Sequence, residues 1–514
     1  MQQKLTLKVL PSEAASTEAL RSKIAQACAI EPASLTGFTI DRKSLDARSR
    51  QAWYQLTITA FIDEPFVPRA VIAPALRDVS KATRQVVVVG AGPAGLFAAL
   101  RLIEQGIRPI VLERGKDVRA RRRDLAAMNK EGIVNPESNY CFGEGGAGTY
   151  SDGKLYTRST KRGDVQRILN YLVHFGADEK ILHEAHPHIG TNKLPQIITA
   201  IRDAINAHGG EVRFEKKLVD LVIDKGVVTR VRTADGEEIP AHAVILATGH
   251  SARDIFEMLH GKGLQIMFKP FALGVRVEHP QALIDAAQYH CEWRSEHLPP
   301  AAYSLVQQVD GKGVFSFCMC PGGIIAPAAT AAGEIVVNGW SPSKRNNPYA
   351  NSGIVVNIEE EDVQPFRARG PLAGLHYQHD VERKAFDAGG GKLVAPAQRL
   401  VDFTKNIVSG SLPDCSYLPR VHSTSLKTVL PPAVHASLQA AFREFGKKIR
   451  GYFTNEAVVV ATESRTSSPV RIPRDPETLQ HPQVRNLYPC AEGAGYAGGI
   501  VSAAMDGERV AGMI

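Results

Sequence analysis

The sequence lacks long apolar runs: no stretch of about eighteen uninterrupted apolar residues occurs, so no transmembrane helix is predicted. Its first ten residues, MQQKLTLKVL, lack the apolar core and the small-residue cleavage site of a signal peptide. The 7 cysteines are an odd number scattered along the chain, which excludes a secreted disulfide framework and favours a reducing compartment. We therefore expect a cytoplasmic globular protein with no membrane partner.

A strong charge of one sign is also missing, because a net charge of +8 is mild for 514 residues. The densest run of cations is Arg119 and Arg121 to Arg123, followed by Asp124. A solvated helix face is the main interpretation of this run, and a phosphate or nucleic-acid patch is the alternative. No aromatic residues are interleaved with the charges, so nucleic acid is not favoured as a partner. No metal site is predicted.

The length predicts roughly three domains, or two with large insertions. Apolar alternation and helical spacing predict a small α+β domain over residues 1–62, in the order strand, helix, turn and strand over 4–10, 17–29, 44–49 and 53–62. This β-α-β pattern is typical of half a ferredoxin-like unit. Residues 63–84 contain three prolines and are predicted to form a linker with one helix.

A β-α-β unit begins at residue 85. Residues 86–89 form an apolar β-branched run, the mark of a strand buried on both faces of a parallel sheet. The run leads into GAGPAGLFAALRLIEQG, and a second strand follows over 109–113. Gly90 permits a tight turn, Gly92 lets backbone approach a pyrophosphate, and Gly95 lets the helix pack against the strand. A dinucleotide site is predicted here, and a glycine turn without a nucleotide is the alternative.

Glu113 ends the second strand and is placed to bind the hydroxyls of the adenosine ribose. An acid at this position repels a 2′-phosphate, so the half-site favours FAD or NAD over NADP. Three later segments favour FAD, which is longer: the glycine-rich 142–154, the strand end at 247–249, and 492–500, whose helix would direct its N-terminus at the flavin. The predicted cofactor contacts are Gly90, Gly92, Pro93, Ala94, Gly95, Glu113, Arg114, Gly145, Gly146, Gly148, Thr149, Lys154, Val219, Thr248, Gly249, Glu492, Gly495, Gly498, Gly499 and Ile500.

These segments together resemble the glutathione-reductase-type FAD/NAD(P)-binding flavoproteins. Within that group the chain resembles a bacterial family described as uncharacterised FAD-dependent (NAD/FAD-utilising) dehydrogenases. The segments that carry this resemblance are GAGPAGLFAAL, FGEGGAGTYSDGKLYTR, ATGHSARDIFEML, KPFALGVRVEHPQ, FCMCPGG, ESRTSSPVRIPRD and EGAGYAGGIVSAAMDG. The resemblance implies the fold and FAD but no substrate. Glu492 departs from the broader superfamily, where many members carry Asp, which puts the contact with the ribityl chain in doubt.

The resemblance and the patterns together predict an α/β fold: a Rossmann-type FAD/NAD(P)-binding domain, an inserted α+β cap or substrate domain, and the small N-terminal α+β domain. The FAD-binding domain would comprise residues 85–269 and 471–514, and the cap domain residues 270–470. Residues 217–249 are expected to form a β-meander, and residues 270–470 short strands between turns, with a helix at 433–450. A second glycine fingerprint with a following acid is missing, so a dedicated NAD(P)H domain is not expected.

Several side chains are candidates for the chemistry. Cys318 and Cys320 form a C-x-C motif, which is either a redox-active thiol pair on one face of a strand or two buried structural cysteines. His250 and Arg253 follow the strand end at 247–249 and would bind an anion, move a proton, or brace a helix or phosphate. A cationic lining of the site is expected from Lys154, Arg276, His422, Arg465 and Arg471.

The predicted function is an FAD-dependent oxidoreductase that transfers two electrons at the flavin N5. Its small-molecule substrate is unknown, and NAD(P)H is a candidate transient reductant. The alternative is a non-catalytic or electron-relay flavoprotein in which residues 1–62 dock a redox protein partner. A nucleic-acid-modifying flavoenzyme is a third hypothesis, which the basic charge alone suggests.

Overall fold

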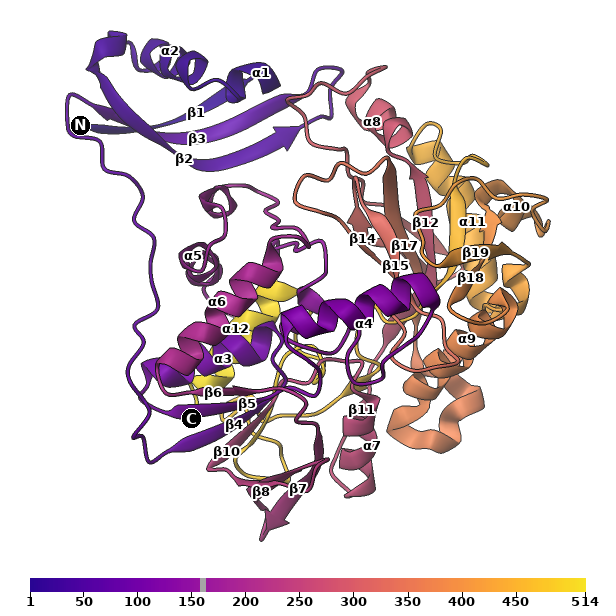
Figure 1. Ribbon diagram of the computed structural model, residues 1–514. Helices are drawn as coiled ribbons and strands as arrows, with labels where there is room; N and C mark the ends of the chain where they lie inside the picture. The colour runs from indigo at the N-terminus through magenta and orange to yellow at the C-terminus, as the bar shows by residue number, and fades with distance from the viewer. Residues whose placement is uncertain (158–162) are drawn as a thin grey trace.

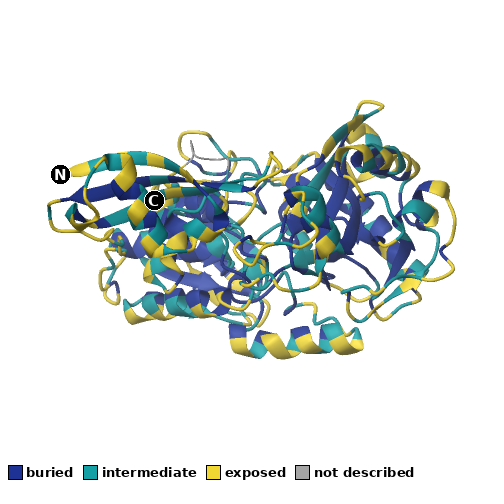
Figure 2. Cartoon of the chain, turned by 90° about the horizontal axis from the view of Figure 1, so that it is seen from above, coloured by how far each residue is buried: buried dark blue, intermediate teal, exposed yellow. Residues whose placement is uncertain are grey.

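The computed structural model describes residues 1–157 and 163–514. The N-terminal domain, a Rossmann-type domain with a parallel sheet, and a second domain with a mostly antiparallel sheet lie beside one another (Figure 1). Seen from above, the buried residues gather in the interior of each part (Figure 2). In the part of the chain that the structure describes, no helix is long and apolar enough to cross a membrane.

The N-terminal domain is a three-stranded sheet covered by helices. Its elements are β1 (Gln2–Val9), α1 (Pro11–Ala14), α2 (Thr17–Cys28), η1 (Pro32–Ser34), β2 (Leu35–Asp46) and β3 (Trp53–Ile62). Strands β1 and β2 each pair antiparallel with β3 between them, so they are parallel to each other, as in a split β-α-β unit. The turn predicted at 44–49 is wrong over its first half, because Ser44 to Asp46 continue the pairing of β2 with β3.

Residues 63–84 run without a helix down to the Rossmann-type domain, so the helix predicted in this linker is wrong. Its three prolines lack an N–H and bias the preceding residues toward extended backbone. The linker still packs: the Ile72 N–H donates to the Asn170 side chain at 3.1 Å. A second attachment joins β2 to a loop, where Lys43 exchanges backbone hydrogen bonds with His183 and Ala185 at 2.7 and 2.9 Å.

The Rossmann-type domain is built on five parallel strands in the order β22-β10-β4-β5-β6. Residues 86–89 are buried in the middle of this sheet, as their apolar run predicts. The elements of the domain are β4 (Gln85–Val89), α3 (Pro93–Glu104), β5 (Arg108–Leu112), α4 (Val118–Glu131), η2 (Gly146–Gly148), α5 (Val165–His174), η4 (Glu179–Leu182), α6 (Leu194–Ala207), β6 (Glu211–Arg213), β10 (Ala243–Leu246), α7 (Arg253–Gly261), β22 (Leu487–Pro489) and α12 (Ile500–Ala511).

A small antiparallel meander projects from this domain and consists of β7 (Leu218–Asp224), β8 (Val227–Thr233) and β9 (Glu238–Pro240). The predicted meander included the strand that begins at Ala243. That assignment is wrong, because β10 pairs with β4 and β22 in the parallel sheet. All four residues of β10 are buried, which fits a strand covered on both faces.

Helices α3 and α12 cross closely, because Gly507 leaves room at the contact: a Cβ there would lie 2.1 Å from the Ala94 carbonyl oxygen. Gly95 lets α3 approach its own turn closely, since a Cβ there would lie 1.9 Å from the Gly90 carbonyl oxygen. The C-terminal helix is thereby fixed against the helix of the first glycine turn.

The second domain is organised on a seven-stranded sheet in the order β13-β14-β17-β12-β20-β18-β19. The short strands predicted for this region are wrong for its centre: β12 and β17 have 10 residues each. Because these strands are buried on both faces, they show no apolar–polar alternation that would reveal their length. The helix predicted at 433–450 is confirmed as α11, whereas the 17-residue α9 was not predicted.

The elements of the second domain and of the segments beside it are β11 (Met267–Phe268), β12 (Phe271–Pro280), α8 (Gln281–Tyr289), β13 (Val306–Val309), β14 (Lys312–Cys320), β15 (Ile324–Pro327), β16 (Val337–Trp340), β17 (Tyr349–Ile358), η5 (Glu360–Leu372), α9 (Ala373–Gly389), β18 (Val394–Arg399), α10 (Leu400–Lys405), β19 (Arg420–Ser423), η6 (Leu426–Thr428), α11 (Pro432–Lys448), β20 (Val458–Glu463) and β21 (Val470–Arg471).

Candidate active site

A cavity of about 310 Å³ is lined by residues of both the Rossmann-type domain and the second domain. This volume is typical of sites that bury a small-molecule ligand. The first domain contributes the carboxyl ends of β4, β5 and β10 and the start of α12, and the second contributes β14, β15, β16 and the end of β20. The cavity therefore joins the edge at which open α/β sheets bind ligands to the wall of another domain.

The glycine turn between β4 and α3 forms one end of the cavity wall. Gly92 caps α3 in an extended conformation, and Pro93 begins the helix, a position where its missing N–H costs nothing. A Cβ on Gly92 would meet no atom of the described residues within 4 Å, so the space beside this residue is open to a ligand. The helix N-terminus offers N–H groups and partial positive charge to an anion.

Glu113 is buried at the end of β5 and lines the cavity, where its carboxylate accepts three backbone N–H groups. Oε2 accepts from Ala91 at 3.0 Å, and Oε1 accepts from Gly115 and Gly143 at 2.9 Å each. The sequence predicted a ribose contact for this side chain. The structure shows that it also joins the first glycine turn to the later glycine-rich segment.

The glycine-rich segment is organised by Arg121 on α4. Its guanidinium donates to the carbonyls of Asn139, Glu144 and Tyr140 at 2.8–2.9 Å. The interpretation of the arginine run as a solvated face is wrong for this residue, which is fully buried, although its neighbours Arg122 and Arg123 are exposed. One position of a helix can face inward within a charged run, because successive residues point in different directions.

The strand end after β10 brings Thr248, Gly249 and His250 to the cavity. The Thr248 Oγ1 is buried and has no hydrogen-bond partner among the described residues. The His250 Nδ1 lies 3.4 Å from the Glu492 Oε1, which comes from the segment after β22. Glu492, Gly499 and Ile500 also line the cavity, so the N-terminus of α12 begins at its wall.

In the second domain, Cys318 lies where β14 departs from regular pairing with β17. The register shifts between Phe317 and Cys320, and Cys318 has a φ of +46°. Both cysteines line the cavity, but Cys318 is exposed to it and Cys320 is buried, so the expectation of two cysteines on one face of a regular strand is wrong. Desolvation by the surrounding protein raises the pKa of Cys318 to about 11, which disfavours a reactive thiolate.

The predicted cationic lining is correct for Lys154 and Arg465, which both lie at the cavity wall. It is wrong for the other three cations. Arg276 is completely buried behind the wall, where it pairs with Glu463 at 2.8 Å. His422 lies on the outer strand β19, and Arg471 lies over the Tyr496 ring at 5.1 Å, so neither side chain lines the cavity.

Arg253 points away from the cavity into a buried ionic network, so its expected contact with a ligand is wrong. Arg253 binds the Glu382 carboxylate at 2.8 Å, and Arg465 binds Glu334 and Glu382 at 2.7 and 2.9 Å. Although burial opposes it, the charge of Arg465 holds the pKa of Glu334 well below its ordinary value.

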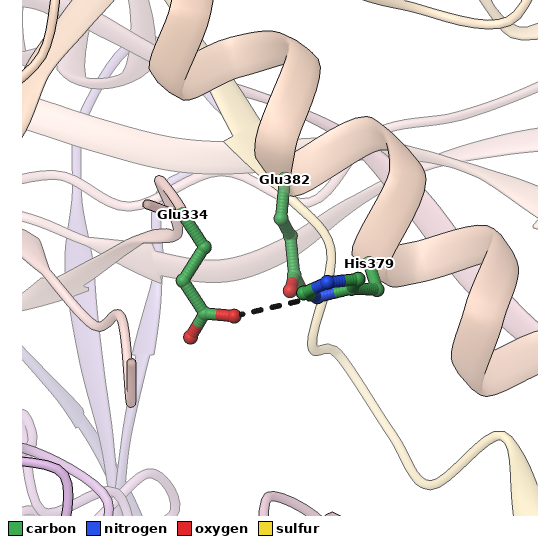
Figure 3. Close-up of side chains that lie close together, drawn as sticks. All are labelled: Glu334, His379 and Glu382. Atoms are coloured by element: carbon green, nitrogen blue, oxygen red, sulfur yellow. Dashed lines mark ion pairs between the residues drawn. The ribbon is translucent and has the colours of Figure 1, made fainter. Parts of the chain in front are cut away.

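His379 and Glu382 on α9 face Glu334 on a loop (Figure 3), and the His379 Nδ1 lies 3.7 Å from Glu334. Ligand atoms of these three residues all lie within 4.8 Å of one another, a spacing that would permit a metal ion. Because two arginines already bind the two carboxylates, the cluster is better described as an ion-pair network that joins α7 to the second domain.

Most of the predicted cofactor contacts line the cavity, and six do not: Gly95, Gly145, Thr149, Val219, Gly495 and Gly498. Gly95 packs against Gly90, and Thr149 is buried and bonds the Glu144 carbonyl at 2.6 Å. The Val219 side chain is exposed, since its neighbour Leu218 takes the inward position of β7. Cavity residues that were not candidates in the sequence include Tyr140, Cys141, Lys216, Lys217, Trp340 and Glu463, whereas Tyr150 and Asp152 lie within the predicted segment 142–154. Asp152 could have been proposed from the sequence as a cavity residue, because it lies in the same Ser-Asp-Gly-Lys run as the candidate Lys154.

Comparison with known families agrees with this geometry. A family described as "FAD binding domain" matches residues 83–252, "FAD dependent oxidoreductase" matches residues 190–332, and "FAD-dependent protein, C-terminal domain-like" matches residues 270–466. Residues 1–61 match a domain of unknown function. An uncharacterized protein of Clostridium beijerinckii is 43% identical over 429 residues, which cover 83% of this chain and 79% of that protein.

The chain belongs to the FAD-dependent oxidoreductase family. A thiamine thiazole synthase of Aeropyrum pernix is 26% identical to this chain over 211 residues, which cover 38% of this chain and 66% of that protein. Among solved structures, the amino acid oxidase NikD has 14% identity and a TM-score of 0.33, with 84% of this chain and 94% of that chain covered.

The cavity fits FAD. Cβ atoms on Gly92, Gly249 or Gly499 would meet no described atom within 4 Å, so space for a ligand lies beside three of the wall's glycines. The unpartnered Thr248 hydroxyl gives a polar group for such a ligand. Together with the N-termini of α3 and α12, these features suit a dinucleotide with a negatively charged centre.

Proposed function

We propose that the protein is an FAD-dependent dehydrogenase or reductase that acts on a small molecule held between the FAD-binding domain and the second domain. The observation that carries this proposal is that one continuous cavity extends from the glycine turn at Gly92 to the second-domain wall at Cys318 and Glu463. FAD, when bound, supplies two-electron chemistry at N5. The protein supplies the binding geometry and the electrostatics.

The proposed cofactor contacts follow from the cavity wall. Gly90, Gly92 and the first turn of α3 would hold the pyrophosphate, because Gly92 leaves open space beside the N-terminus of the helix. Glu113 would accept a hydrogen bond from the adenosine ribose, because its carboxylate can accept more than the three N–H groups that it already binds. Arg114 contacts Glu137 and Asp254 and lies 4.2 Å over the Phe142 ring, so it would stiffen this end of the site.

At the other end, Glu492 would bind a ribityl hydroxyl, and α12 would direct the positive end of its dipole at the flavin. The helix begins at Ile500, directly after the cavity-lining Gly499. Negative charge that develops next to a helix N-terminus is stabilised. His250, which is 3.4 Å from Glu492, would hold that carboxylate in place.

A nicotinamide reductant would have to use the same cavity for a short time. Within residues 1–157 and 163–514, no second parallel β-α-β unit with a glycine turn is present beside the one at Gly92. We therefore propose that NADH or NADPH, if it is the reductant, docks transiently on the second-domain side.

The test uses the purified full-length protein. It should carry the visible absorption bands of oxidised flavin, and anaerobic addition of NADH or NADPH should bleach them. A colourless protein that takes up no FAD on reconstitution would overturn the proposal. If FAD is bound and neither nicotinamide bleaches it while a reduced redox protein does, the flavoprotein is an electron relay and the reductase proposal is wrong.

A further inference from the structure

Lys154 presents a cation to the cavity from the end of the glycine-rich segment. Its side chain is 36% exposed, and its Nζ donates to the Met319 carbonyl and lies 3.9 Å from the Cys320 Sγ. Both contacts are with the second domain, so Lys154 stands where the two domains meet. An ammonium group has three donors, which leaves it capacity to bind a ligand.

The acids near Lys154 have closer partners of their own. Asp152 lies 3.8 Å from the Lys154 Nζ but binds Arg345 at 2.7 Å. Glu463 binds Arg276 at 2.8 Å. This cluster of five charged groups, three cations and two acids, therefore has one positive charge in excess.

Glu463 increases this excess when it is protonated. Burial raises the pKa of Glu463 to about 7, against the opposing charges of Arg276 and Lys154. The groups that face it are Arg276 from β12, Lys154 from the glycine-rich segment, and the thiol of Cys318 from β14. Near neutral pH a fraction of the molecules therefore has no negative charge on Glu463.

Much of the wall around this cluster is apolar or aromatic, although Asn338 and Thr466 also line it. Aromatic rings are supplied by Tyr140, Tyr150, Phe317 and Trp340, and small apolar side chains by Ala326, Pro327, Ala328, Val336 and Val337. A ligand that fits this wall has a flat or apolar body. Its charged end would lie at the cluster of Lys154.

We propose that the substrate is an organic carboxylate with an apolar body, bound through its carboxylate to Lys154. The proposal rests on the proposed function, because it assigns the substrate of that same cavity. An excess cation in a cavity that limits the access of water attracts an anion more strongly than the same cation does at the surface. Ionised Glu463 would repel the carboxylate, so binding should weaken as the pH rises through about 7.

Three probes that share a phenyl ring and differ in charge test this inference: benzoate, benzamide and benzylamine. Each is titrated into the FAD-loaded protein, and binding is followed by calorimetry and by the change in the flavin spectrum. We expect benzoate to bind at least about tenfold more tightly than benzamide, and benzylamine most weakly. Calorimetry reports binding without a flavin signal, so a failure of the proposed function and a failure of this inference give different results.

Substitutions at Lys154 and Glu463 test whether these two residues cause the preference for benzoate and its pH dependence. Lys154→Met should reduce benzoate affinity to that of benzamide with FAD content unchanged, and Lys154→Arg should keep the preference. Glu463→Gln keeps an acceptor for Arg276 and should remove the pH dependence of benzoate binding. Glu278→Gln is the matched control, because burial also raises the pKa of Glu278 to about 7 but the residue lies outside the cavity wall.

Equal affinity for benzoate and benzamide in the wild-type protein would overturn the inference. Loss of FAD from both Lys154→Met and Lys154→Arg would also overturn it, because Lys154 would then be a cofactor ligand. A pH dependence that persists in Glu463→Gln would remove Glu463 from the carboxylate site.

Discussion

The Glu113 carboxylate accepts the backbone N–H of Gly143 at 2.9 Å, across 30 positions of sequence. The same side chain binds the N–H groups of Ala91 and Gly115, so one buried acid joins the glycine turn, the end of β5 and the glycine-rich segment. These are three of the segments that line the cofactor cavity, and their relative placement depends on this residue.

Glu113→Gln should therefore destabilise the protein and weaken FAD binding. An amide offers one acceptor oxygen, so its NH₂ group would face at least one buried N–H donor. We expect a loss of about 1–3 kcal/mol in the free energy of unfolding. Chemical denaturation measures this loss, and the exposed Glu215→Gln serves as the control. An unchanged unfolding midpoint in Glu113→Gln would contradict the joining role.

Gly92→Val should abolish FAD binding while the fold persists. The Cβ of the variant meets no atom within 4 Å among the described residues, so we expect its conflict to be with the pyrophosphate. The measurement is the ratio of flavin to protein absorbance after reconstitution with FAD. Gly410→Val is the matched control, since its Cβ also meets no atom within 4 Å and it lies outside the cavity wall. Full flavin occupancy in Gly92→Val would show that the pyrophosphate lies elsewhere.

Arg121→Lys should lower both stability and FAD content. Lysine cannot reproduce the planar guanidinium that binds the carbonyls of Asn139, Tyr140 and Glu144. Each buried carbonyl left without a donor costs about 1–3 kcal/mol. The measurement is the thermal unfolding temperature of the purified variant, and the exposed Arg123→Lys is the control. If the two variants unfold at the same temperature, Arg121 does not organise the segment.

His279 should make stability fall in acid. Burial lowers the pKa of His279 from 6.5 to about 4, although its hydrogen bond to the Tyr452 carbonyl opposes the shift. Between these values the unfolded chain binds more protons than the folded chain, so stability is lost as the pH falls from 6.5 towards 4. One such buried histidine lowers the free energy of unfolding by about 3 kcal/mol when the pH falls through this range.

The measurement is the unfolding free energy of His279→Gln relative to wild type at several pH values. Gln can still donate to the Tyr452 carbonyl, so the difference should move in favour of the variant as the pH falls below 6.5. His188, whose pKa burial also lowers to about 4, leaves a residual dependence in both proteins. The exposed His297→Gln is the control, and a difference that does not change with pH would refute the prediction.

The sequence by itself determined the parts of this protein that local rules control. The apolar run at 86–89 and the turn at Gly90, Gly92 and Gly95 fixed a parallel strand, a helix N-terminus and a phosphate-sized opening, because each requires specific residues at adjacent positions. The glycine-containing segments at 142–154, 247–249 and 492–500 indicated the extent of the cavity, because they too require specific residues at adjacent positions.

Only the tertiary structure decided which charged side chains face the cavity. Arg253 and Lys154 are both cations next to glycine-rich turns, yet one binds Glu382 in a buried network and the other lines the cavity. Glu463 begins the segment ESRTSSPVRIPRD but was not a candidate, because its role depends on Arg276 of the neighbouring strand β12. Burial and charge pairing arise between residues distant in sequence, and they set the protonation and direction of each side chain.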